Sequence, residues 1–263
     1  GDSAGITAAQ ALGEPLTQGA LNTKHSGGAL GSKRVAVSGF KVLNQIMQSP
    51  ASYPNKATVS EEMGSVDSIE EAPQGGNFIT INDKKHYVLP GMELDVKKGD
   101  KVEPGDVLSD GVLDIKDIIR QRGIGAGRKH YAEYLKEVFE NGGIYAASRN
   151  LEFLARGAID HVRVAGNEAM GGYLPEDLAS YNTLMSTYSP GKNSKITAPS
   201  DSVGKYLESP ALHYSIGTKL TPKMVNKLRE ANFKDVIVAD EPPPFAPEMI
   251  RLRTAVQHEP DWM

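Results

Sequence analysis

The sequence has no cysteine among its 263 residues. This absence excludes a disulfide framework, thiolate-held zinc or iron–sulfur sites and thiol catalysis, and it fits a reducing compartment. No apolar run approaches the roughly 18 residues that a membrane span needs. The opening Gly1-Asp2-Ser3 resembles neither a signal nor a transit peptide, and the missing initiator Met suggests a processed or split chain. We therefore expect a soluble cytoplasmic protein, or part of one, with no membrane partner.

There is also no excess of positive charge. The chain has 29 basic and 33 acidic residues, a net charge of −4, which excludes a polybasic coat for nucleic acid as a whole-chain property. The charge is uneven, however. Residues 1–50 have four basic and two acidic residues, whereas residues 51–110 have six basic and twelve acidic ones. If any surface contacts phosphate, the first fifty residues are the better candidates.

Most motifs of free-standing enzymes are missing. The sequence contains no nucleophile elbow, no P-loop and no dinucleotide fingerprint. Gly123 to Gly127 resembles a phosphate loop only superficially, because it follows a helix pattern rather than a strand. The six histidines lie far apart and lack metal-ligand spacing, so we expect no metal site built by this chain alone; they are His25, His86, His130, His161, His213 and His258.

The local patterns predict an α+β fold that begins with a helical segment over residues 1–50. Residues 3–12 are rich in small residues and predict a short helix, which Gly13-Glu14-Pro15 ends. Residues 16–25 are only weakly helical, because glycine and polar residues lower their propensity. A glycine-rich loop follows to residue 34, and apolar spacing predicts another helix over residues 39–48.

Residues 51–112 change to a β pattern. Short runs of β-type residues at 78–81 and 87–89 alternate with turn signals. In residues 94–111, glycines at positions 99, 105 and 111 recur every six residues, which predicts very short strands and repeated reversals. We expect a small barrel-sandwich β module here.

Residues 113–165 form a predicted helical section. Asp114 caps a first helix that ends near Gly123. Two amphipathic helices joined by a short glycine loop then predict an αα-hairpin. Their core residues are Tyr131, Tyr134, Leu135, Val138 and Phe139 on the first helix, and Leu151, Leu154, Ala155, Ala158 and Ile159 on the second.

Residues 166–263 predict a loop-rich, mixed α/β section. Residues 165–200 are rich in Gly, Ser, Asn and Pro, which favours a long surface loop. Residues 203–238 predict a strand, a turn, a helix capped by Thr221-Pro222, and a second strand. The buried face of that helix is expected to contain Met224, Val225, Leu228 and Ala231. The prolines at 242–244 and the end of the chain, Asp261-Trp262-Met263, are typical of a docking tail.

One polar face stands out in the weak helix over residues 16–25. Gln18, Leu21, Asn22 and His25 recur at i, i+3, i+4 and i+7, so they share one side. This face combines an apolar side chain, two amides and an imidazole. Spacing alone favours a surface helix whose leucine contacts the core.

The same stretch, GDSAGITAAQALGEPLTQGALNTKHSGGA, resembles the trigger loop of multisubunit DNA-dependent RNA polymerases, in the C-terminal part of the largest subunit (bacterial β′). AAQALGEPLTQ follows the family's Ala-Gln, Gly-Glu-Pro and Thr-Gln pattern. The order Leu21-Asn22-Thr23-x-His25 is closer to the eukaryotic nuclear enzymes than to the usual bacterial Met-Arg pair.

The resemblance extends along about 175 residues. GFKVLNQIMQSP (39–50) resembles the helix that follows the trigger loop, and residues 57–69 and 94–111 resemble the family's small barrel-sandwich module. LDIKDIIRQRGI (113–124) and the helices to Val164 resemble its downstream helical section, and GGYLPEDL (171–178) a family loop. The match is specific at 4–34 and 94–124 and loose elsewhere.

The resemblance implies roles for individual residues. Gln18 and Asn22 would bind the sugar of the incoming NTP, Leu21 would stack on its base, and His25 would reach the triphosphate as a positional catalyst or a general acid. It also implies other polymerase subunits, template DNA and product RNA as partners. No Asp-x-Asp-x-Asp motif occurs, so the catalytic Mg²⁺ is expected on another chain, and this chain should be inactive alone.

Two features depart from the family. Lys24 stands where an aromatic residue is usual, and it either contacts phosphate or is solvated. Residues 180–263 do not follow the typical bacterial C-terminal pattern. Together with the abrupt start, this suggests a divergent enzyme with a split largest subunit, such as a bacteriophage polymerase, located in host cytoplasm or associated with the virion.

Two other functions fit parts of the sequence. Glycine turns at 99, 105 and 111 also suit a lipoyl- or biotinyl-type carrier module, in which Lys84, at a hairpin tip, would be the modified lysine. This hypothesis leaves residues 1–34 unexplained. The second alternative is a purely structural adaptor, in which the residues of the polar face take no part in catalysis.

Overall fold

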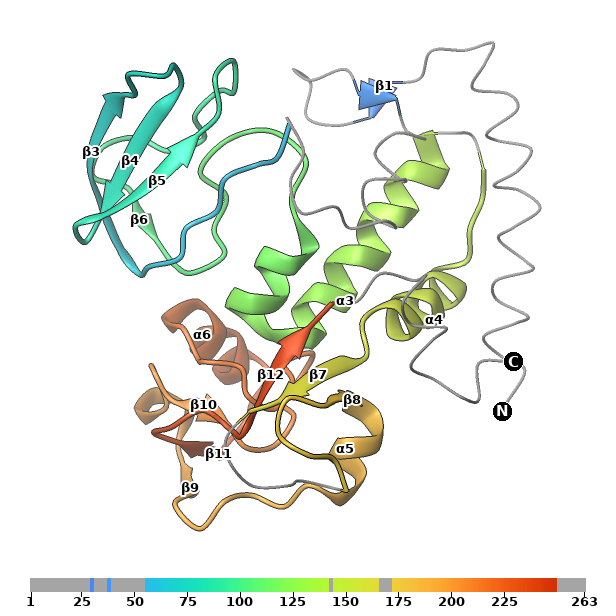
Figure 1. Cartoon of the computed structure of the whole chain (residues 1–263). Helices are drawn as coiled ribbons and strands as arrows, with labels where there is room; N and C mark the ends of the chain where they lie inside the picture. The colour runs from blue at the N-terminus through green and yellow to red at the C-terminus, as the bar shows by residue number, and fades with distance from the viewer. Residues whose placement is uncertain (1–28, 31–36, 39–54, 142–143, 166–171, 250–263) are drawn as a thin grey trace. The chain divides into compact units, whose positions relative to one another are not determined.

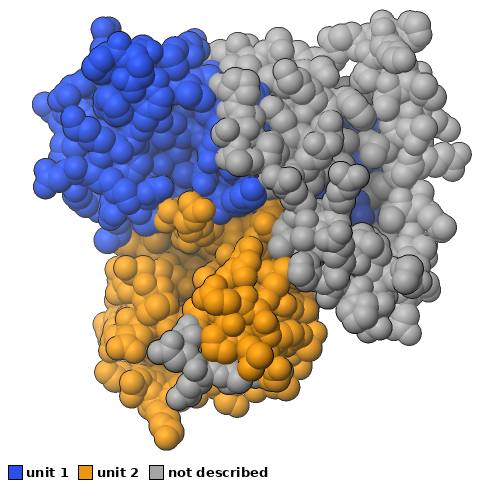
Figure 2. All heavy atoms as spheres, viewed as in Figure 1, with its two compact units in different colours: residues 1–117, 131–155 blue, residues 118–130, 156–263 orange. Residues whose placement is uncertain are grey.

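The computed structural model describes residues 29–30, 37–38, 55–141, 144–165 and 172–249. The helices expected at 3–12, 16–25 and 39–48 lie outside these residues. The first two described pieces are strands: β1 (Ala29–Leu30) pairs antiparallel with β2 (Val37–Ser38). The chain divides into two compact units, residues 1–117 with 131–155 and residues 118–130 with 156–263 (Figure 2).

The first unit contains the predicted β module. Four antiparallel strands lie in the order β5-β4-β3-β6 (Figure 1). They are β3 (Gly64–Glu71), β4 (Asn77–Ile81), β5 (Lys84–Val88) and β6 (Lys101–Val102). Side chains alternate between solvent and the interior, as the period of a strand requires. The interior is filled by Val66, Ile79, Ile81, Val88, Val96, Val102 and Leu108.

The glycine turns of the module are confirmed. Gly99, Gly105 and Gly111 have φ values of 92°, 81° and 121°, which side chains with a Cβ rarely adopt. The turn at Gly99 donates its N–H to Val66, and the turn at Gly105 donates its N–H to Ser60. Around these turns the pairing consists of the two-residue strand β6 and of single bridges, for example between Leu94 and Ser109, so the strands are as short as predicted.

The helical section forms as predicted, and its first two helices are continuous in the chain. α3 (Ile115–Asn141) contains two helices joined directly at Gly123, where φ is 83° and ψ is 171°. Asp114 caps the first, because its carboxylate accepts the Lys116 N–H. The first helix therefore ends where the sequence predicted, and the next begins at once.

α4 (Ser148–Ala158) completes the helical section. Most of the expected core residues of the predicted αα-hairpin are buried, whereas Tyr134 and Leu154 are half-buried.

The C-terminal section has two small antiparallel sheets. One has the order β12-β7-β8, from β7 (His161–Val164), β8 (Leu178–Ser180) and β12 (Phe245–Glu248). The other has the order β10-β11-β9, from β9 (Lys195–Thr197), β10 (Tyr206–Leu207) and β11 (Val236–Ala239). The remaining elements are α5 (Tyr181–Thr187), α6 (Pro222–Glu230) and a 3-10 turn, η1 (Pro199–Asp201).

α6 forms as the sequence predicts, with one exception. Thr221 accepts the N–H of Met224, and Pro222 occupies the first turn, where its missing N–H costs nothing. Met224, Val225 and Leu228 are buried against the β10-β11-β9 sheet core. Ala231 was expected on this buried face and is instead the exposed C-cap residue, because the helix ends at Glu230.

Two other predictions for this section were wrong. Residues 165–200 were expected to be a loop, yet they contain β8, α5 and β9. The reason lies in Ser180, which caps α5 by accepting the Thr183 N–H, and in Tyr181 and Leu184, which are buried one turn apart. Phe245–Glu248, which follows the prolines at 242–244 within the expected docking tail, instead pairs with β7, and the end of the chain lies outside the described residues. The observed architecture is α+β, as predicted.

Candidate functional site

The four residues expected to contact substrate lie outside the described residues. Gln18, Leu21, Asn22 and His25 all precede Ala29, where the description begins. Their roles therefore stay predictions. The described residues do include Lys84 and the glycines at 123–127, the other two motifs that the sequence singled out.

Lys84 does not lie at the tip of its hairpin. Asn82 and Asp83 form the two-residue turn, with φ values of 47° and 66°, and Lys84 is the first residue of β5, paired with Ile81. Its ammonium contacts the carboxylates of Glu61 at 2.7 Å and Glu62 at 3.5 Å. The hydrogen bond to Glu61 raises the pKa of Lys84, which keeps the amine protonated. Lys84 therefore lies within a strand and is paired with carboxylates, which is not the turn position that the carrier hypothesis expected.

The glycines at 123–127 serve close packing instead of phosphate binding. Residues 124–127 are helical, within α3. A Cβ on Gly125 would lie 1.7 Å from the carbonyl oxygen of His213, and one on Gly127 would lie 2.3 Å from the Ile119 side chain. The backbone of α3 therefore approaches its neighbours more closely than any other residue type would allow.

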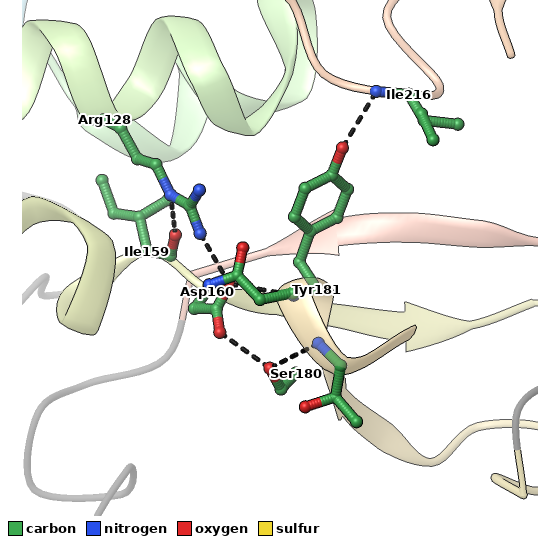
Figure 3. Close-up of polar contacts among 8 residues, drawn as sticks. Arg128, Ile159, Asp160, Ser180, Tyr181 and Ile216 are labelled. Atoms are coloured by element: carbon green, nitrogen blue, oxygen red, sulfur yellow. Dashed lines mark hydrogen bonds and ion pairs between the residues drawn. The ribbon is translucent and has the colours of Figure 1, made fainter. Parts of the chain in front are cut away.

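A polar network, which we call the Arg128–Asp160 network, lies in the second unit (Figure 3). Arg128 reaches from α3 to the end of α4, where its Nε donates to the Ile159 carbonyl at 2.7 Å. Its Nη2 donates to Asp160 Oδ1 at 2.6 Å. The two side chains are only 18% and 13% exposed, so solvent screens this ion pair weakly.

Asp160 also organises the start of α5. Its Oδ2 accepts the Ser180 hydroxyl at 2.7 Å, and its Oδ1 accepts the Asn182 N–H at 3.2 Å. Its backbone carbonyl accepts the Tyr181 N–H at 2.6 Å. A carboxylate at a helix N-terminus is stabilised by the exposed N–H groups there. Asp160, which directly precedes β7, thus links that strand to α3 through Arg128 and to the start of α5.

Tyr181 extends the network to a distant loop. Its hydroxyl accepts the Ile216 N–H at 3.0 Å, and its ring lies 5.7 Å from the Arg128 guanidinium, within cation–π range (Figure 3). Burial raises the pKa of Tyr181, and burial lowers the pKa of Arg128 against the opposing effect of Asp160. An arginine nevertheless stays charged.

A second ion pair joins two strands of the β12-β7-β8 sheet. Arg163 on β7 binds both carboxylate oxygens of Glu248 on β12, at 2.6 and 2.7 Å. Its remaining nitrogen donates to the Glu176 carbonyl at 2.7 Å. This bidentate geometry is the strongest form of arginine–carboxylate contact.

The Arg128–Asp160 network and the Arg163–Glu248 pair hold helices and strands together. Both oxygens of Asp160 accept hydrogen bonds, and the Arg128 guanidinium is paired with this carboxylate, so the ion pair holds neighbouring elements together. Among the residues that the structure describes, no group of three or more His, Asp or Glu could hold a metal ion. In the same part of the chain, no helix is long and apolar enough to cross a membrane.

The Arg128–Asp160 network was not predicted from the sequence. One signal was present: Asp160 lies two residues after the helix that ends at Ala158, where the helix dipole disfavours negative charge. An acidic residue at that position needs a local cation. Its partner, 32 residues earlier in the chain, was not marked by any spacing rule.

Comparisons with known proteins identify the family. Residues 1–173 match the family model of RNA polymerase Rpb1, domain 5. The chain is 33% identical over 167 residues to the DNA-directed RNA polymerase subunit beta' of Malacoplasma penetrans, a match that covers 61% of this chain and 13% of that protein. The subunit beta' of Mycoplasma genitalium is 32% identical over 174 residues, which cover 64% of this chain and 13% of that protein.

A third relative matches over a longer stretch. The subunit beta' of Limosilactobacillus fermentum is 31% identical over 199 residues, which cover 71% of this chain and 16% of that protein. The chain thus spans 13 to 16% of the length of these relatives. Because the family model covers about two thirds of the sequence, the chain belongs to the RNA polymerase Rpb1, domain 5 family, and corresponds to a C-terminal part of the largest polymerase subunit.

Proposed function

We propose that this chain supplies the mobile trigger loop of a DNA-directed RNA polymerase and closes it over the incoming NTP during nucleotidyl transfer. The observation that carries the proposal is the extent of the family match, which includes residues 16–25 and their polar face. The relatives' printed name, DNA-directed RNA polymerase subunit beta', supports the reaction type.

The residues of the polar face contact three different parts of the NTP in this proposal. Gln18 and Asn22 hydrogen-bond the sugar and so favour ribose, because a site built around a hydroxyl rejects the analogue that lacks it. Leu21 packs on the base. His25 reaches the triphosphate, where it stabilises developing charge or protonates the leaving pyrophosphate.

The weak helix propensity of residues 16–25 suits this task. Gly19, Asn22 and Thr23 each lower the stability of a helix there. The helix then folds fully only when a correct NTP adds contacts, so substrate binding itself assembles the site. Closure excludes water and aligns the reacting groups.

Other chains of the assembly complete the reaction. A subunit that carries the aspartates missing here would hold the catalytic Mg²⁺, which would supply the charge stabilisation that nucleotidyl transfer needs. Template DNA, product RNA and the remaining polymerase subunits are the partners, in the cytoplasm. The described units of this chain act as a scaffold whose polar side chains are mutually bound.

The experiment that tests this function is reconstitution with the remaining polymerase chains. We expect template-directed RNA synthesis only when this chain is present. Asn22→Ala should reduce the preference for rNTP over dNTP by about tenfold or more, the value of one lost hydrogen bond in a closed site. Lys24→Ala serves as the matched control and should leave this preference unchanged. RNA synthesis with unaltered selectivity would favour the structural adaptor, and synthesis without the chain would refute the proposal.

A further inference from the structure

The β10-β11-β9 sheet has one covered face and one open face. α6 packs on the covered face, against a core that includes Leu207 and Val238. Cross-strand partners point to the same side of a sheet, and side chains alternate along each strand. The register therefore places four side chains together on the opposite face, which we call the outer sheet face: Tyr206, Ala239, Ile237 and Ile196. None of the four is buried, and Ile196 is 73% exposed.

Lys219 extends the outer sheet face beyond β10. It forms an antiparallel bridge with Tyr206, and backbone hydrogen bonds of 3.0 and 2.8 Å on either side hold residues 218–220 along β10. Lys219 thus lies on the same face as Tyr206. Its ammonium is 5.7 Å from the centre of the Tyr206 ring, within cation–π range. A cation, an aromatic ring and aliphatic side chains therefore follow one another across this face.

The section that contains this sheet is positively charged, unlike the chain as a whole. Residues 191–239 include eight basic and four acidic residues, whereas the full chain has 29 basic and 33 acidic ones. Seven of the eight basic side chains are exposed, and Lys205 is half-buried. Of the acidic side chains, Glu208 is buried and accepts the Tyr188 hydroxyl. The potential around this section therefore attracts anions, although the net charge of the chain is negative.

We propose that the outer sheet face binds single-stranded RNA, with Lys219 on a phosphate and bases on Tyr206 and Ile196. Stacking of a base on an aromatic ring is largely independent of sequence, because every base has a π face. When RNA binds, Lys219 exchanges the Tyr206 ring for a phosphate, and the ring accepts a base. The polymerase's own product is such a strand, and this identification of the RNA rests on the proposed function.

A single strand matches this face better than a duplex does. A duplex presents its phosphates and sugars outward and keeps the faces of its bases stacked inside. It would contact the lysines but leave Ile196 and Ile237 without an apolar partner. An unpaired strand offers phosphates and base faces together, which are the two chemistries that Lys219 and its neighbours on the sheet present.

The test is fluorescence anisotropy of the purified full chain with a labelled single-stranded oligoribonucleotide of about 12 nucleotides. Tyr206→Leu keeps an apolar side chain but loses the ring, and its affinity should fall at least fivefold. Ile196→Glu places a negative charge on the face and should lower the affinity by a similar factor. Lys219→Gln should reduce the slope of log affinity against log salt by about 0.7, the value of one phosphate contact on a single strand.

Lys98→Gln is the matched control for the lost charge. Lys98 is an exposed lysine of the β module, and its substitution should leave the affinity within twofold of wild type. Melting temperatures show whether each variant is folded. Ile196→Glu keeps the test valid even if Tyr206→Leu unfolds, because Ile196 lies mostly in solvent.

Several results would overturn this inference. Wild-type RNA affinity in folded Tyr206→Leu and Ile196→Glu would do so, as would an equal loss in Lys98→Gln or tighter binding of a duplex than of the single strand. If these variants bind RNA normally but lose affinity for the other polymerase chains, the face belongs to a protein partner instead.

The active assembly tests the identity of the strand. A photocrosslinking uridine analogue in the product RNA should form crosslinks to residues 205–220, and crosslinks from the template strand alone would overturn RNA as the partner. The anisotropy assay needs neither NTP nor the other chains. An assembly that binds RNA at this face but synthesises none would therefore reject the proposed function and retain the RNA-binding face.

Discussion

Removal of the Asp160 carboxylate tests whether the Arg128–Asp160 network stabilises the second unit. Asp160→Ala leaves the Arg128 guanidinium buried without its counter-charge, which costs about 3–5 kcal/mol in a buried pair. Because the two side chains are 18% and 13% exposed, we take about 3 kcal/mol for this loss. The unpaired Ser180 and Asn182 donors add about 1 kcal/mol, which gives about 4 kcal/mol in total.

Amide hydrogen exchange with mass spectrometry measures this loss locally. A loss of about 4 kcal/mol accelerates exchange through unfolding by about 10³-fold, since each 1.4 kcal/mol is a factor of ten. We expect this acceleration in peptides from residues 156–165 and 178–187. The β module, residues 64–88, is the internal reference and should keep its exchange rate.

Asp240→Ala is the matched control. Asp240 pairs with Lys195 at 3.5 Å, but these side chains are 64% and 66% exposed, so we expect an effect below about 1 kcal/mol. In Arg128→Met combined with Asp160→Ala no buried charge remains, so part of the stability should return. Equal exchange in Asp160→Ala and Asp240→Ala would refute the assigned role.

Three shorter predictions follow from other contacts. Gly125→Ala should destabilise the second unit by about 3 kcal/mol or more in thermal denaturation, since its Cβ would meet His213, whereas Gly157→Ala, with open space around it, should stabilise α4 by about 0.5–1 kcal/mol. Burial raises the pKa of Tyr131 to about 12, so between pH 10 and 12 only the unfolded chain loses this proton. Tyr131 alone should then lower the stability by about 1.4 kcal/mol per pH unit, and Tyr131→Phe should reduce the slope by that amount in urea denaturation. Lys84→Arg should leave RNA synthesis unchanged, and the intact mass of the wild-type chain should contain no acyl adduct. A lipoyl or biotinyl mass on Lys84 would revive the carrier hypothesis.

Features that depend on neighbouring residues could be predicted from the sequence. The glycine turns of the β module follow from φ values that only glycine adopts readily, and the α6 start follows from the Thr221-Pro222 pair. The apolar spacing around Leu135 and Leu151 likewise placed the core of the helical hairpin. In each case the signal lies within a few residues.

Features that depend on distant residues could not be predicted. β12 pairs with β7 across 85 residues, as the Arg163–Glu248 contact shows, and no local pattern encodes that partner. α5 was missed because its polar composition resembles a loop, while Tyr181 is buried by contacts with Arg128 and Ile216. For the polar face that contains His25, spacing favoured a surface helix, and only the family resemblance indicated substrate contacts.

The most direct test of the central claim is the rate of single-nucleotide addition by the assembled polymerase with His25→Ala. At saturating NTP, rapid-quench kinetics should show a decrease of roughly 10²-fold or more, the scale of a lost acid or charge-stabilising group. Lys195→Ala, which removes an exposed side chain of β9, is the control and should stay close to the wild-type rate. A wild-type rate for His25→Ala in an active assembly would contradict the role of this segment in closing over the NTP.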